Sequence, residues 1–213
     1  NWVSHISEGV ADAGYNDEGP VELDRQLDGF GNFQLIPEDV GGDSLLNAFY
    51  DIFFELFQGN IATVQNLLTD ARLGGKYEVV TITDNGNDYY VLREVLNDYY
   101  FDDNGTPGDA SDDVTGSFDY GWGLYIVNPN ATNPHIMIEV PHPCDDYTTP
   151  AIAFDAMLTV GAGLLFINGA GREVEWSGIE PYYNSRSYSD PTRNARHPFQ
   201  EAHKAAVDLH QDE

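Results

Sequence analysis

Two short apolar runs that flank a helix pattern constrain this fold more than any other feature. Residues 136–140 (IMIEV) and 163–168 (GLLFIN) are apolar at successive positions, which is typical of strands covered on both faces. Between them, Thr148 or Thr149 can cap a helix that has Pro150 in its first turn. A strand, a helix and a strand in this order form a crossover unit, so the two strands are predicted to be parallel.

The remaining elements follow from hydrophobic period, which is helical in some segments and alternating in others. Helices are predicted from Leu45 to Gly59, over 61–73 and over 198–209, and strands over 76–83, 89–95 and 122–128. We therefore expect an α/β fold with a mixed, largely parallel sheet flanked by helices. This domain is predicted to span 41–213, after an acidic N-terminal extension over 1–40 with little regular structure.

The charge of the chain excludes several classes of partner. There are 36 acidic residues against 9 basic ones, for a formal net charge of −27. Such a surface repels nucleic acids and anionic membranes, so we expect no nucleic-acid partner. No apolar run approaches the roughly 18 residues of a membrane span, so membrane insertion is not expected either. Three interpretations of the acidity remain: adaptation to salt, cation binding, or solubility of a secreted protein. We favour the third, with some of the second.

Two acidic loops and the chain ends bear on cofactors and localisation. Residues 84–88 and 102–113 place oxygen ligands at alternating positions, which suits Ca²⁺, although neither loop matches a full EF-hand and each can simply be solvated. The chain starts at Asn1 and its single cysteine, Cys144, cannot form an internal disulfide. We expect a processed or partial chain from a secreted, extracellular protein. Cys144 is interpreted as a small filler residue.

The loop after residues 136–140 is the main candidate site, because open α/β sheets bind ligands beyond the carboxyl ends of their strands. His142 supplies a neutral nitrogen, and Asp145 or Asp146 supplies an oxygen a few residues later, a spacing that suits Zn²⁺. A third ligand must come from the last helix, from His197 or His203. The alternative is a strand-end histidine bonded to a backbone carbonyl.

This turn also resembles a known family. Residues 138–149 (IEVPHPCDDYTT) are similar to the metal-binding turn of the N-formylglutamate amidohydrolase group, which belongs to the carboxypeptidase-like zinc hydrolases and carries the pattern E/Q-V-P-H-P-x-x-D-x-x-T. The resemblance covers about residues 77–209. The motif F-Q-x-x-H is kept at 199–203.

Two other motifs of those relatives are altered in this chain. The relatives' G-T-H-R corresponds to residues 169–172, where Gly171 stands in place of the histidine. Their S-D-x-x-H-N corresponds to residues 189–194, where Arg193 stands in place of the histidine.

The resemblance implies a carboxypeptidase-like three-layer sandwich and a secreted zinc-dependent hydrolase acting on an amide or peptide bond of a small-molecule or peptide substrate. It implies His142, Asp146 and His203 as metal ligands. Arg172 can bind a substrate carboxylate in a bidentate fork, or can form a surface ion pair. No motif assigns a general base. Glu139 alternates on its strand and can point away from the site, and Glu173 and Glu175 are candidates that no motif supports.

A second hypothesis follows from the two missing histidines. In it, the chain is a non-catalytic relative that serves as a structural, cation-binding or self-assembling module of a larger extracellular protein. A further open feature is the run of Tyr182, Tyr183 and Tyr188 around Arg186. These side chains could line a polar pocket or form an ordered loop with an aromatic rim.

Overall fold

The structure, a computed structural model, describes residues 15–16, 19–20, 33–36, 40–84, 86–95, 97–102, 114–117, 120–143, 149–172 and 187–210. Its elements in chain order are β1 (Tyr15–Asn16), β2 (Gly19–Pro20), α3 (Val40–Phe57), α4 (Ile61–Leu67), β3 (Tyr77–Asp84), β4 (Asn87–Glu94), β5 (Asn97–Asp102), β6 (Val114–Ser117), β7 (Leu124–Val127), β8 (Asn133–Val140), α5 (Thr149–Val160), β9 (Ala162–Ile167) and α6 (Pro198–His210). None of the described helices is long and apolar enough to cross a membrane.

A five-stranded mixed sheet with the order β3-β4-β7-β9-β8 forms the centre of the fold. The predicted crossover unit is confirmed, because β8 and β9 are parallel and α5 lies between them in the chain. The expectation of a largely parallel sheet was wrong: the other three pairings are antiparallel. The physical reason is connectivity. A tight turn joins β3 to β4, and α3 and α4 both precede β3, so neither helix can act as a crossover between strands of this sheet.

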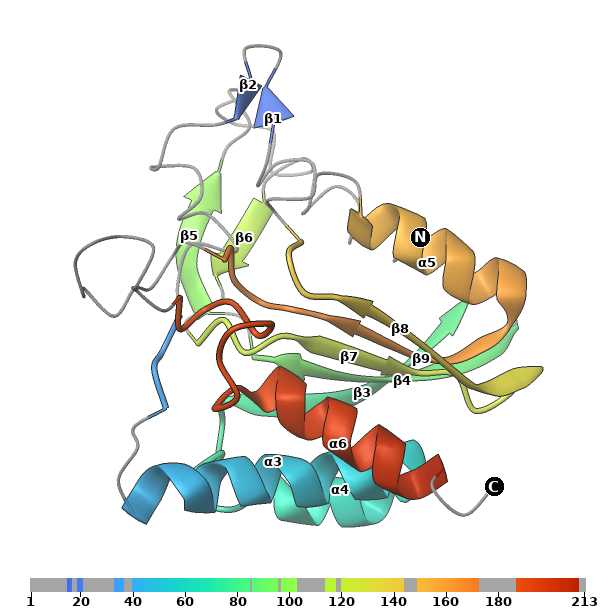
Figure 1. The fold of residues 1–213 in the computed structure, drawn as a ribbon, viewed down its shortest axis with the longest axis horizontal. Helices are drawn as coiled ribbons and strands as arrows, with labels where there is room; N and C mark the ends of the chain where they lie inside the picture. Colours follow the sequence, from blue (N-terminus) through green and yellow to red (C-terminus); the bar gives the residue numbers. More distant parts are fainter. Residues whose placement is uncertain are drawn as a thin grey trace.

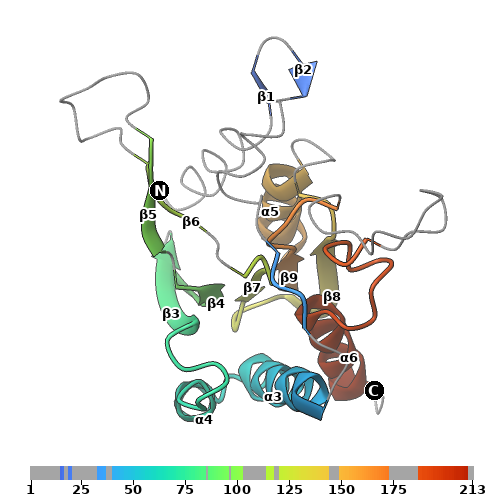
Figure 2. The same ribbon diagram turned by 90° about the vertical axis from the view of Figure 1, so that its left-hand side faces the viewer.

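Helices cover both faces of this sheet, with α5 on one side and α3, α4 and α6 on the other (Figures 1 and 2). The larger core lies under α3 and α6, where Phe49, Phe53, Trp122, Tyr125 and Phe166 are at most 1% exposed. A smaller apolar cluster, centred on side chains of β9 and α5, fills the other face. The aromatic stripe predicted for the first helix is therefore a core-packing feature, as expected.

Element ends differ from the predictions where local polar groups compete with the helix. The second helix, α4, ends at Leu67 rather than continuing to Leu73. The Asp70 side chain accepts the Arg72 backbone N–H at 2.9 Å and also pairs with the Arg72 guanidinium. This local hydrogen bond gives the backbone an alternative to another helical turn. The small sheet of β5 and β6 was not predicted at all.

β8 is an edge strand, which corrects a second prediction. It was expected to be covered on both faces, but its first residues, Asn133–Ile136, are exposed and only Val140 is buried. Side chains alternate along it: Met137 packs on the α3–α6 side, whereas Ile138 packs on the α5 side. β9 is buried at every position, as predicted.

Part of the predicted N-terminal extension packs against the domain. Ile36 is 1% exposed and belongs to the larger core. The backbone carbonyl of Gln34 accepts the indole N–H of Trp122 at 2.7 Å, and the Gln34 N–H donates to the carbonyl of Tyr120 at 2.8 Å. Residues 33–36 are thus held in place on the sheet domain, while the boundary near residue 40 stays a prediction.

Candidate functional site

Asn168 joins three segments at the carboxyl ends of β8 and β9. Its side chain is fully buried, and Nδ2 donates to the carbonyls of Pro141 at 3.0 Å, Ala170 at 2.8 Å and Ser189 at 3.0 Å. Its backbone N–H donates to the carbonyl of Val140 at 3.0 Å. Because β8 and β9 are parallel, their carboxyl ends lie side by side at one end of the strands. There, Asn168 connects the His142 turn to residues 168–172 and 187–194.

His142 forms a close pair with Asp190 at this edge. Its Nε2 lies 3.0 Å from Asp190 Oδ1, and the side chains are 16% and 1% exposed respectively. The same oxygen accepts the Thr192 backbone N–H at 2.9 Å and the Thr192 hydroxyl at 2.6 Å. The alternative in which His142 is fixed only by a backbone carbonyl is therefore not what the structure shows.

The protonation of this pair follows from the contacts of Asp190. Burial raises the pKa of the Asp190 carboxyl, but hydrogen bonds from Thr192 and His142 outweigh burial and lower that pKa below 3.8. A carboxylate can only accept, so Nε2 of His142 carries the hydrogen. In the neutral ring, Nδ1 then holds the lone pair, so Nδ1 is the nitrogen with the electron pair needed to ligate a metal.

Arg193 approaches the other oxygen of the same carboxylate. Its Nε lies 3.3 Å from Asp190 Oδ2, close enough for an ion pair, although the N–H is not aligned for a hydrogen bond. The side chain of Arg193 is 56% exposed. The backbone N–H groups of Arg193 and Asn194 both donate to the Asp190 carbonyl at 3.0 Å. A guanidinium thus stands beside the His142 pair.

His197, one alternative for the third ligand, is a buried and neutral core residue. Its Nδ1 accepts the Phe199 backbone N–H at 3.1 Å, and its ring stacks on Phe33 with centroids 5.1 Å apart. Burial lowers the pKa of His197 to about 3. Its Nε2 is buried without a hydrogen-bond partner. With Nδ1 engaged by the backbone, only Nε2 of this ring could turn to a ligand.

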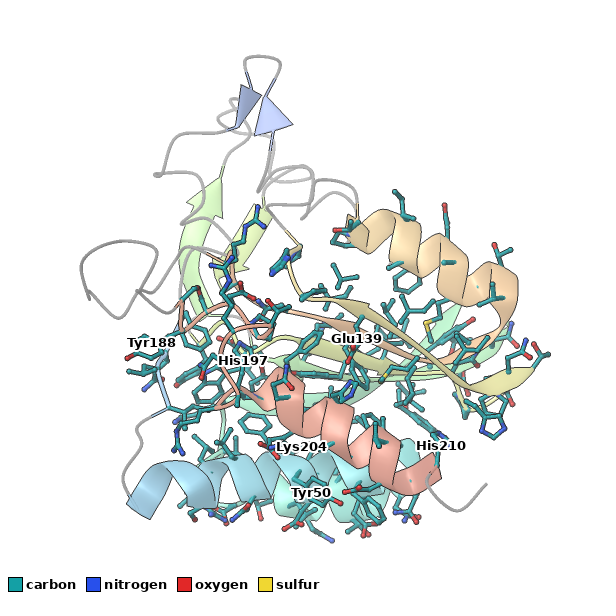
Figure 3. The ribbon with its side chains drawn as sticks, viewed as in Figure 1. Tyr50, Glu139, Tyr188, His197, Lys204 and His210 are labelled. Atoms are coloured by element: carbon teal, nitrogen blue, oxygen red, sulfur yellow. The ribbon has the colours of Figure 1, made fainter. Side chains whose placement is uncertain are left out.

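His203, the other candidate for the third ligand, pairs elsewhere. Its Nδ1 lies 2.9 Å from Glu139 Oε1, so α6 is linked to the face of β8 that it covers (Figure 3). The structure therefore places His142 and His203 in two separate carboxylate pairs. Glu139, considered as a general base, points toward α6 and away from the α5 face.

The structure describes only some of the predicted metal ligands. Asp145 and Asp146 lie outside the described residues, as does Cys144. Among the residues that are described, no group of three or more His, Cys, Asp and Glu side chains could hold a metal ion. Zinc binding by His142, Asp146 and His203 stays a prediction.

Two further predictions, for Arg172 and for the acidic loops, concern segments that the structure describes only in part. Arg172 is half-buried at the end of the 168–172 segment, and the Ser187 hydroxyl donates to its backbone carbonyl, so its role toward a substrate stays open. Of residues 84–88, Asp84 ends β3 and Asn87 and Asp88 begin β4, where the Thr83 hydroxyl donates to Asp88 at 2.5 Å. Residues 103–113 lie outside the described part, so calcium binding also stays a prediction.

Comparison with known proteins adds no identity. No family model, curated protein or solved structure matches the chain. The fold and the site define a mixed α/β protein in which a partly buried histidine pairs with a buried carboxylate at the carboxyl ends of two parallel strands. Sequence reasoning did not assign a role to Asp190, although the signal was present: Asp190 is the aspartate of the Ser189–Asn194 motif. No sequence signal marks Asn168, whose role depends on three carbonyls from separate segments.

Proposed function

We propose that this chain is a secreted, zinc-dependent hydrolase-like domain of the carboxypeptidase-like type, acting on an amide or peptide bond. The pair of His142 and Asp190 is the observation that carries the proposal. Histidines that ligate metals commonly donate their second ring N–H to a carboxylate, which fixes the tautomer and raises the basicity of the ligating nitrogen. The buried Asp190 carboxylate supports His142 in this way.

The residues present fit a zinc ion in part. His142 would ligate through Nδ1, Asp146 would follow from the same turn, and a third ligand is open between His197 and His203. A zinc ion bound there would lower the pKa of a bound water and polarise the scissile carbonyl. In this proposal, Asp190 keeps His142 in the Nε2–H tautomer, and Asn168 holds the turn against the edge of the sheet.

One observation favours a second candidate function. The Arg193 guanidinium lies 3.3 Å from Asp190, where the resembling family has a histidine. Its positive charge opposes the binding of a metal cation beside the same carboxylate. The alternative is a non-catalytic module of a larger extracellular protein, in which Arg193 rather than a metal balances the Asp190 charge.

Zinc titration against a competing chelator tests the proposal. We expect one zinc per chain, loss of that binding in His142→Ala, and affinity lowered by about 10–100-fold in Asp190→Asn. His135→Ala, which removes an exposed histidine of β8, is the matched control and should bind zinc like the parent chain. Absence of stoichiometric zinc, or equal binding by His142→Ala, would refute the proposal.

Hydrolysis assays separate the two candidate functions. With zinc bound, release of amines from a panel of N-acyl amino acids and dipeptides is expected for the parent chain and not for His142→Ala. Zinc binding without any hydrolysis would leave the metal site in place and favour the non-catalytic module.

A further inference from the structure

Two histidines from distant parts of the chain meet where α6 ends. Nδ1 of His135, near the start of β8, lies 3.4 Å from Nδ1 of His210, in the last turn of α6. The ring centroids are 5.1 Å apart, and the ring planes are inclined at 78° to each other. Figure 3 shows His210 at the end of α6 that is farther from His197. The His142 turn follows the other end of β8, so this histidine pair is separate from the site described above.

The packing of α6 on β8 positions the two rings. His203 Nδ1 lies 2.9 Å from Glu139 Oε1, which joins the helix to the strand at a second place. From His203 to His210 the helix advances by about 10.5 Å. From Glu139 back to His135 the strand extends over about 13 Å, and both side chains lie on the same face of the sheet. Because the two advances are similar, α6 runs beside β8 in the opposite direction, and His210 reaches His135.

The distance between the two Nδ1 atoms suits a shared metal ion better than a hydrogen bond. Hydrogen bonds from N–H groups span about 2.7–3.2 Å in proteins, so the observed 3.4 Å is long for one. Two histidine nitrogens that bind one tetrahedral Zn²⁺ at about 2.0–2.1 Å lie about 3.3–3.4 Å from each other. The pair therefore already has the ligand spacing that a tetrahedral metal requires.

The electrostatic surroundings of the pair favour a cation. His210 stands in the last turn of α6, where the negative end of the helix dipole lies. The net charge of −27 also concentrates cations at the surface of the molecule. Imidazole nitrogens select Zn²⁺ and similar metals, whereas hard cations such as Ca²⁺ prefer oxygen ligands. Because the described residues contain no group of three His, Cys, Asp and Glu side chains able to hold a metal, water would complete the coordination here.

We propose that His135 and His210 form a surface site for a divalent metal such as Zn²⁺, which both Nδ1 atoms ligate. A bound ion would tie the start of β8 to the end of α6. The site does not depend on the zinc proposed for His142, and it does not require either ring to lack other contacts. Two nitrogens and water hold zinc less tightly than three protein ligands. A chelator that competes with the His142 site therefore keeps this one empty, and His135→Ala remains a valid control in that titration.

Long-range ¹H–¹⁵N correlation spectra of the full, ¹⁵N-labelled chain test this site, because they resolve the ring nitrogens of each histidine. Zinc is added without a chelator at about pH 8, since ligation requires neutral rings. We expect the Nδ1 signals of His135 and His210 to shift together and to saturate, whereas Ca²⁺ at the same concentration should leave both unchanged. The same spectra report on the ring of His142, so failure of either metal site is distinguished from failure of the other. A zinc response at one ring of the pair, or at neither, would overturn the proposal.

Variants show whether the two rings act as one site. His135→Gln and His210→Gln should each weaken zinc binding at the remaining ring by about ten-fold or more, since even the loss of an outer-shell partner costs about 10–100-fold. His135 is exposed and His210 is partly exposed, so we expect both variants to fold. His142→Ala removes a histidine from the other proposed site, and the zinc response of His135 and His210 should be the same in it as in the parent chain. An unchanged response of His210 in His135→Gln would also overturn the proposal.

Discussion

His197 is the residue whose environment has the clearest thermodynamic consequence. The folded state keeps the ring neutral because burial lowers its pKa to about 3, whereas the unfolded chain takes up a proton at the ordinary value of 6.5. Between these values the unfolded state binds more protons than the folded state. The free energy of unfolding therefore falls by about 1.4 kcal/mol per pH unit below pH 6.5 from this residue alone. Above pH 6.5 its contribution is constant.

Urea unfolding between pH 6.5 and pH 4.5 measures this effect. In His197→Phe, which keeps an aromatic ring beside Phe33, the slope of stability against pH should be shallower by about 1.4 kcal/mol per unit. Its absolute stability also changes, because the Phe199 N–H loses its acceptor, so the slope is the readout. His210→Gln, which removes the histidine in the last turn of α6, where it contacts His135, is the control for the loss of a histidine as such. An unchanged slope in His197→Phe would mean that His197 titrates normally in the folded protein.

At the same scale, the candidate site shows which residues a sequence can reveal. His142 was found because its turn has a recognisable spacing of polar groups after an apolar strand. Asp190 was visible only as part of a motif, and its partner was not. Asn168 resembles any residue after a strand, because its function lies in carbonyls contributed by residues 141, 170 and 189. The amino-acid sequence does not show which backbone carbonyls will accept a hydrogen bond, because every residue has one.

The pairing of β8 with β9 depends on a close approach at one glycine. A Cβ added to Gly163 in β9 would lie 2.3 Å from the backbone carbonyl oxygen of Pro134 in β8. A backbone atom cannot move aside as a flexible side chain can, so the two strands would have to separate. The register of this pairing is irregular between Asn133 and Met137, the stretch that contains Pro134.

Gly163→Ala should lower the free energy of unfolding by about 3 kcal/mol, at the upper end of overpacking costs. Gly75→Ala is the matched control: Gly75 has a φ of +77°, and nothing lies within 4 Å of its added Cβ. That variant should cost about 1–2 kcal/mol from backbone conformation alone. Chemical denaturation of both variants gives the comparison, and equal losses would show that the approach of β8 to β9 is not tight.

Individual elements were predicted correctly where the hydrophobic periodicity and the flanking turn or capping residues indicate the same element. The hairpin of β3 and β4, the helix α5 and the buried strand β9 were all predicted from local pattern. The edge position of β8 was missed, because an apolar run reads the same at the edge of a sheet as at its centre. The antiparallel pairing of β7 with β9 was likewise invisible, since these strands are separated in the chain by β8 and α5.

At the scale of the whole molecule, a net charge of −27 makes the folded state self-repelling. Raising NaCl from about 0.1 M to about 1 M shortens the screening length from about 10 Å to about 3 Å. We expect the melting temperature to rise by about 2–4 °C for each kcal/mol of repulsion that is screened. Choline chloride at the same ionic strength is the control, because it screens charge without a cation that carboxylates bind closely.

The two salts distinguish the interpretations of the acidity. Equal stabilisation by both indicates general screening. A larger effect of sodium, or a steep effect of millimolar calcium at constant ionic strength, would instead indicate specific cation sites such as the acidic loops. A melting temperature that falls as either salt is added would contradict the prediction of self-repulsion.

The sequence by itself determined the α/β class, the parallel β8–α5–β9 unit and the position of the His142 turn, because these depend on periodicity and on residues close together in the chain. The tertiary structure alone decided that the sheet is mostly antiparallel, that His142 pairs with Asp190, that His203 pairs with Glu139, and that His135 meets His210. The physical reason is the separation of the interacting residues along the chain. Strand order and side-chain pairing between distant segments arise from how the core packs, and packing is a property of the assembled chain rather than of any local stretch of it.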